Sequence, residues 1–107
     1  MSIAMKSTVW ELDLPPDQKF LLLHLADCAN DQGRIPWRPS RERAQICCIS
    51  LILVQKILRD FVETGVLVVE ISDTASGRPP AYRLDLTTAA ALFPRIKRIP
   101  YRRKRRA

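Results

Sequence analysis

The chain has 107 residues, 47% of them apolar, which suits one compact domain and argues against disorder over most of its length. Its apolar runs are too short for a membrane helix and its first residues lack a secretory signal, so we expect a cytoplasmic protein without membrane association. Three cysteines and a single histidine, His24, do not have the spacing of a metal site, and no nucleophile–base pair is recognisable. The sequence therefore predicts neither a metal, a cofactor nor an enzyme.

The net charge of +7 is concentrated at the C-terminal end. Residues 95–107 contain eight of the 18 basic residues and no acid, whereas residues 1–94 carry a net charge of −1. We therefore divide the chain into a folded domain, 1–94, and a basic disordered tail, 95–107. Such a tail binds polyanions through counterion release, without sequence preference; the alternative is a solubilising end or a linker. The tail residues expected to contact DNA are Arg102, Arg103, Lys104, Arg105 and Arg106.

The first third of the chain predicts a loose leader, a strand and a long helix. Residues 1–7 show no pattern, and residues 8–14 alternate apolar and polar side chains, with Trp10 on the apolar side, as in a half-buried strand. A mostly apolar helix follows from Pro16 and stops before Gly33. Because this helix is apolar on most sides, we expect several neighbours to bury it.

Two shorter helices are predicted in tandem in the centre of the chain. Ser40 is a candidate N-cap for a helix that ends near Cys47, and Ser50 is one for a helix that runs to a stop at Gly65. Ala44 is the small residue needed where two helices cross closely. This segment is predicted to be a helix-turn-helix.

The remaining residues before the tail predict a β-hairpin and a short helix. Residues 66–71 are rich in β-branched side chains, 72–80 are rich in turn formers, and 81–86 alternate again. Residues 87–93 could add a short capped helix. The order of the elements is typical of an α+β winged helix-turn-helix, with a three-helix core and a β-hairpin wing.

Several short motifs extend this interpretation to a family. They are Leu25-Ala26-Asp27, Ala29-Asn30-Asp31, Trp37, Pro39-Ser40, Ser50-x3-Val54 and Phe61-x3-Gly65-Val66-Leu67. Over residues 8–86 the chain resembles the winged helix-turn-helix family of phage and plasmid replication proteins and related DNA-binding regulators. Two features depart from that family: Arg38 interrupts its tryptophan-proline-serine motif, and Leu51-Ile52-Leu53 is apolar where polar residues usually follow the serine. The resemblance implies a winged helix that binds duplex DNA, often at replication origins or operators.

The second helix of the pair predicts a face for DNA. At about 100° per residue, Val54, Ile57, Leu58 and Phe61 share a buried stripe, with Leu51 and Leu53 at its edges. The opposite face carries Ile52, Gln55, Lys56 and Arg59. Glutamine can pair with adenine, basic side chains can contact guanine or phosphate, and an aliphatic side chain can contact the thymine methyl group. The alternatives are a merely solvated basic face and a protein-contact patch over residues 51–54.

Other candidate DNA contacts lie on the first helix of the pair and on the wing. Arginines near its start could meet the phosphate backbone, and an arginine at a hairpin tip could approach the minor groove or nearby phosphates; each has the alternative of an ordinary surface charge. These candidates are Arg38, Ser40, Arg41, Arg43, Ser50 and Arg78.

We therefore expect a sequence-specific, double-stranded DNA-binding protein of a phage or plasmid, acting as a replication initiator or accessory factor or as a transcriptional regulator. The expected partners are duplex DNA, a second copy of the chain, and replication or transcription proteins. The alternative is a winged-helix protein-interaction module, such as a mobile-element inhibitor of a host complex, with a tail that binds nucleic acid nonspecifically. The apolar Leu51-Ile52-Leu53 segment and the nearly neutral charge of residues 1–94 motivate this alternative.

Overall fold

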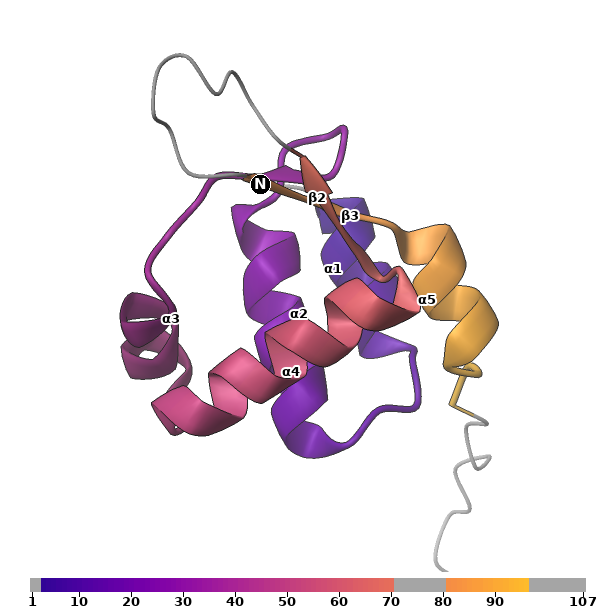
Figure 1. Ribbon diagram of the computed structural model, residues 1–107. Coiled ribbons are helices and arrows are strands. Elements are labelled where there is room, and N and C mark those ends of the chain that lie inside the picture. The colour runs from indigo at the N-terminus through magenta and orange to yellow at the C-terminus, as the bar shows by residue number, and fades with distance from the viewer. Residues whose placement is uncertain (1–2, 71–80, 97–107) are drawn as a thin grey trace, which may run out of the picture.

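Residues 3–70 and 81–96 are described by the computed structural model, and they form five helices and three strands in the order α1–α2–β1–α3–α4–β2–β3–α5 (Figure 1). The strands make one antiparallel sheet in the order β1-β3-β2. The fold is α+β, as predicted, and its order of elements is compatible with a winged helix. Among these residues no helix combines the length and apolar character needed to cross a membrane.

The start of the chain corrects two predictions. Residues 3–10 form the helix α1 (Ile3–Trp10) where a loose leader and a strand over 8–14 were expected. On α1 Met5 and Val9, four residues apart, face the core, while Trp10 is 61% exposed. Leu12 and Leu14, which follow the helix, are also buried. The predicted strand is therefore wrong and Trp10 is not buried, although the alternation correctly indicated that Leu12 and Leu14 are.

The helix α2 (Pro16–Cys28) lies at the centre of the molecule, and α4 crosses it in Figure 1. Proline at its first position and Asp17 in its first turn match the predicted start. Leu21, Leu22 and Leu25 are fully buried, as expected for a helix covered by several neighbours. This helix supplies the core against which the other elements pack.

The connection from α2 into the sheet depends on Asn30 and Gly33. The Asn30 side-chain oxygen accepts hydrogen bonds from the backbone N–H groups of Gln32 and Arg34, which closes the turn. Gly33 has φ +83°, and a Cβ there would lie 2.8 Å from the Leu84 carbonyl oxygen. Glycine is therefore required for the short strand β1 (Arg34–Ile35) to pair with β3.

The helix pair consists of α3 (Ser40–Cys47) and α4 (Leu51–Thr64), close to the predicted bounds. The buried residues of α4 are Val54, Ile57, Leu58 and Phe61, which confirms the predicted stripe. Gly65 ends α4 in the left-handed conformation with φ +87°, as predicted.

After α4 the chain forms β2 (Leu67–Glu70), β3 (Ala81–Leu84) and α5 (Leu86–Leu92), which agrees with the predicted hairpin and short helix. Asp85 caps α5 by accepting a hydrogen bond from the Thr88 N–H at 3.1 Å. Hydrogen bonds from the backbone and side chain of Thr88 lower the pKa of the Asp85 carboxyl group. The predicted turn over 72–80 lies outside the described residues.

The last described residues pair with the residues that follow α1. Leu12 and Arg95 form an antiparallel bridge, the Ile96 N–H donates to the Glu11 carbonyl at 2.8 Å, and the Arg95 side chain forms an ion pair with Glu11 at 2.9 Å. These interactions join residues 95 and 96 to the fold, two positions beyond the predicted boundary at 94. The rest of the predicted tail, residues 97–107, lies outside the described residues.

Candidate nucleic-acid interface

The turn between α3 and α4 is fixed by backbone geometry. Cys48 follows α3 in the left-handed conformation with φ 55°, which is unusual for a residue other than glycine. The N–H groups of Cys48 and Ile49 both donate to the Ala44 carbonyl, and the Ser50 hydroxyl then accepts from the Leu53 N–H at 3.2 Å. Ser50 is therefore the N-cap of α4, as predicted. Its hydroxyl is already engaged in this structural role.

The outer face of α4 is exposed as predicted. Ile52 is 81% exposed, the highest value among the exposed large apolar residues of the described chain, and Gln55, Lys56 and Arg59 are exposed as well. Ala44 and Cys47 face the core from α3, whereas Cys48 is exposed. The faces of α3 and α4 that turn towards the core are thus buried, and the outer face of the first half of α4 is accessible to solvent.

The basic side chains of the described chain fall into two groups. Seven of the ten have a partner, and three, Arg41, Lys56 and Arg59, have no side-chain hydrogen bond or ion pair within residues 3–70 and 81–96. The paired ones are Lys6 with Asp27, Lys19 with the Trp10 carbonyl, Arg34 and Arg83 with Glu70, Arg38 with Glu42, Arg43 with His24 and Pro36, and Arg95 with Glu11. All three unpaired cations lie on the helix pair.

Arg43 corrects the prediction that it contacts DNA. It is 1% exposed, and its two terminal nitrogens donate to His24 Nε2 at 3.2 Å and to the Pro36 carbonyl at 3.1 Å. Because a guanidinium can only donate, His24 Nε2 must be the unprotonated acceptor. Burial, followed by the charges of Arg43 and Arg38, lowers the pKa of His24. Arg43 therefore links α3 to α2 and to the segment after β1.

Two other candidates on α3 have altered roles. Ser40 is the first residue of α3 and not its cap, because Pro39 occupies the N-cap with φ −59° and ψ 140° and no side chain caps the helix. The Ser40 hydroxyl is consequently not engaged by the helix. Arg38 is exposed but forms an ion pair with Glu42 at 2.7 Å, a surface interaction of small energy.

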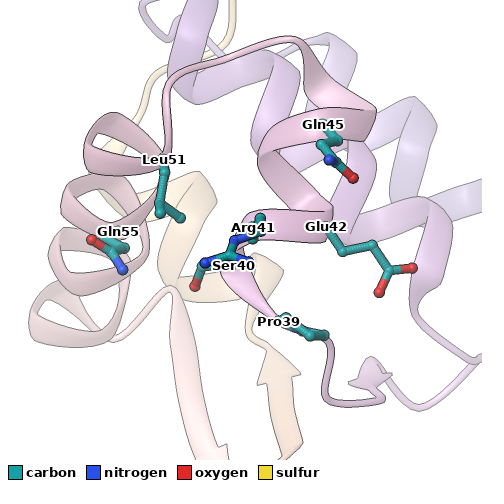
Figure 2. Close-up of a pocket in the computed structure, with 7 residues that line it drawn as sticks. All are labelled: Pro39, Ser40, Arg41, Glu42, Gln45, Leu51 and Gln55. Atoms are coloured by element: carbon teal, nitrogen blue, oxygen red, sulfur yellow. The ribbon is translucent and has the colours of Figure 1, made fainter.

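Two adjoining hollows follow the side of α4 that faces α3 and the sheet. The first, of about 600 Å³, is lined by Pro39, Ser40, Arg41, Glu42, Gln45, Leu51 and Gln55 (Figure 2). In Figure 2 Leu51 and Gln55 extend from α4 towards Ser40 and Arg41 at the start of α3. The second, of about 500 Å³, is lined by Ser40, Gln55, Leu58, Arg59, Val62, Glu63, Val69 and Tyr82. Ser40 and Gln55 belong to both hollows.

Val69 and Tyr82 are residues of this surface that the sequence interpretation missed. They are directly opposite each other in the pairing of β2 with β3. The alternating pattern of 81–86 could have indicated the face of the strand on which Tyr82 lies, but not that this face meets α4. Arg78 and the tail residues Arg102, Arg103, Lys104, Arg105 and Arg106 lie outside the described residues.

Other reactive groups are gathered where α2 meets α3. The Cys28 sulfur lies 3.9 Å from His24 Nε2, and burial raises the pKa of the Cys47 thiol. In residues 3–70 and 81–96 no three histidine, cysteine, aspartate or glutamate side chains are grouped so that they could hold a metal ion. The side chains on the surface of the helix pair can form hydrogen bonds, bind anions through their positive charge and make apolar contacts.

Comparison of the chain with protein-family models, with curated proteins and with solved structures gives no match in any of the three.

Proposed function

We propose that the protein is a winged helix-turn-helix that binds double-stranded DNA sequence-specifically through α3 and α4, without catalytic activity. The observation that carries the proposal is the distribution of free cations: Arg41, Lys56 and Arg59 are unpaired and share the surface of the helix pair, while every other described cation has a partner. Unpaired cations can replace counterions on phosphates without first breaking an interaction within the protein.

The geometry of α4 supports base recognition at its first half. Ile52 projects into solvent at the N-terminal end of the helix, the end that enters the major groove in helix-turn-helix complexes. When an exposed aliphatic side chain contacts a thymine methyl group, apolar surface is removed from water, which favours binding. Lys56 lies one turn further on the same face and can donate to guanine.

The biological role we propose is that of a phage or plasmid protein, either a replication initiator or accessory factor or a transcriptional regulator. In this role it would occupy its DNA site, alone or as a symmetric dimer, and recruit or exclude other proteins.

The experiment is selection of bound fragments from random duplex DNA with the full chain. A variant that keeps the full length but carries Gln at Arg102, Arg103, Lys104, Arg105 and Arg106 is expected to enrich the same sequence with lower affinity. The double variant Ile52→Ala/Lys56→Ala is expected to lose the preference while tail-dependent binding remains. If the tail variant binds no duplex at low salt, the tail is the only DNA-binding part and the proposal fails.

A second candidate function is supported by the apolar residues around the turn. Ile46 is 49% exposed and Leu51 36% exposed beside the more exposed Ile52, so a protein partner could bury them. This candidate is favoured if the tail variant folds but binds no duplex. It then predicts that Ile52→Asp abolishes a protein complex that Lys56→Ala leaves intact.

A further inference from the structure

We propose that the two hollows along α4 form one groove for a single sugar–phosphate strand of duplex DNA, and that Gln55 contacts this backbone and not a base. The inference rests on the proposed function and assigns separate tasks to residues of the same face. It also adds Tyr82, on β3, as a DNA contact.

The position of Gln55 on α4 is the first argument. At about 100° per residue, Leu51, Gln55 and Val62 lie on the flank of the helix that faces α3 and the sheet, whereas Ile52 and Lys56 lie further round, towards solvent. Gln55 lines both hollows, together with Ser40 from the start of α3. Its amide extends sideways into the groove in Figure 2. A base edge in the major groove would instead meet the outermost side chains, Ile52 and Lys56.

The lining of the groove matches the chemistry of a sugar–phosphate strand. Phosphates are bound by cations and neutral donors. The groove has Arg41 in one hollow and Arg59 in the other, neither with a partner among the described residues, and the Ser40 hydroxyl and Gln55 amide line both. Deoxyribose rings need apolar contact, which Leu51 and Val69 provide.

The acidic residues of the lining restrict where the phosphates can lie. Glu42 is neutralised by its ion pair with Arg38. Glu63 has no partner in residues 3–70 and 81–96 and lies one turn beyond Arg59, so it repels a phosphate at that end of the second hollow. The phosphates are therefore placed near Ser40, with Arg41 and Arg59 on either side. Tyr82 lines the second hollow from the strand and can donate its hydroxyl to the phosphate near Arg59.

The first test is the selection experiment repeated with the full chain carrying Gln55→Ala or Tyr82→Phe. Because each variant removes one hydrogen bond to a phosphate, binding should weaken by about 3- to 10-fold for all sequences, and the selected sequence should stay the same. Gln32→Ala, which removes an exposed glutamine in the turn after α2, is the matched control and should bind as wild type. Thermal unfolding followed by circular dichroism verifies that each variant is folded.

The second test uses the selected duplex with one phosphate at a time replaced by a neutral methylphosphonate. The wild-type chain should bind more weakly when neighbouring phosphates of one strand are replaced. Arg59→Gln should be insensitive to replacement of one of them, because the partner charge is already gone.

The outcomes separate this inference from the proposed function. If Gln55→Ala relaxes the preference at one base position, or if Gln55→Ala and Tyr82→Phe both bind as wild type, the backbone groove is wrong and sequence-specific binding stands. Sensitive phosphates scattered over both strands would also overturn it. If the wild-type chain selects no sequence at all, the proposed function itself fails.

Discussion

Two regions of the molecule use positive charge differently. Lys6 and Lys19 have partners across the contact between α1 and α2, and Arg95 pairs with Glu11, just after α1. The cations Arg41, Lys56 and Arg59, on α3 and α4, have no partner among the described residues. In the region around α1, positive charge joins separate segments of the chain. On α3 and α4, it is exposed to solvent next to exposed apolar side chains. The overall charge of residues 1–94, which is −1, conceals this difference. The local pairing of cations is therefore a better guide to a nucleic-acid interface than net charge is.

The strongest test of this comparison is to remove three charges from each region. In a chain with the five tail substitutions, Arg41→Gln/Lys56→Gln/Arg59→Gln should weaken binding to the selected duplex about 100-fold, equivalent to about 2.7 kcal/mol. The plot of the logarithm of the binding constant against the logarithm of the salt concentration has a negative slope, which should become shallower by about 2 to 3. The reason is that up to three phosphates are no longer neutralised.

Its matched control is Lys6→Gln/Lys19→Gln/Arg95→Gln, which changes the net charge equally but removes cations already paired within the protein. Binding should weaken by less than about 3-fold, measured by fluorescence anisotropy at several salt concentrations. Equal weakening in the two triple variants would mean that only net charge matters.

The two arginines of α3 provide the next test. Arg43→Met should lower the free energy of unfolding by about 2 kcal/mol, because His24 Nε2 and the Pro36 carbonyl lose their donor in a largely buried site. Arg41→Gln, two residues away, should change it by less than about 0.5 kcal/mol. Urea unfolding of both variants measures the difference. Equal stability of the two variants would contradict the structural role assigned to Arg43.

A third test concerns pH and His24. The folded-state pKa of His24 lies below its ordinary value of 6.5, mainly because the ring is partly buried and faces Arg43. The unfolded chain therefore binds a proton first as pH falls, so the contribution of His24 to stability is present above pH 6.5 and is lost as pH falls through the folded-state pKa. The effect should be smaller than that of Arg43→Met, because only one of the two Arg43 hydrogen bonds is affected.

Thermal unfolding between pH 7.5 and pH 5 measures this change, and His24→Gln is the control because it cannot titrate. The midpoint of the wild type should fall more than that of His24→Gln over this range. Identical pH dependence in both proteins would show that the Arg43 contact does not control the protonation of His24.

The smallest effect is expected at the surface ion pair of Lys6 and Asp27. The two side chains are 32% and 43% exposed, so solvent screens their attraction. A double-mutant cycle with Lys6→Gln and Asp27→Asn should give a coupling energy below about 0.5 kcal/mol. A value above about 1 kcal/mol would mean that pairing in this region is a larger contribution to stability than we infer.

The sequence predicted the elements whose signals are local. The spacing of Val54, Ile57, Leu58 and Phe61, the serine before α4 and the glycine after it determine that helix, its buried stripe and its exposed face. The β2–β3 hairpin and α5 were predicted for the same reason. The helix α1 was missed because a short segment can satisfy two periodicities at once, and only its neighbours select the one that buries Val9 and exposes Trp10.

The candidate site divides in the same way. Ile52, Lys56 and Arg59 were placed on the outer face of α4 by the sequence alone, because the helical period places them there whatever surrounds the helix. Only the tertiary structure decided that Arg43 is buried while Arg41 is exposed, because the partners of Arg43 come from α2 and from the segment after β1. The tertiary structure also brought Tyr82 and Gln55 to the lining of one hollow, since the packing of a strand against a helix depends on contacts between distant residues.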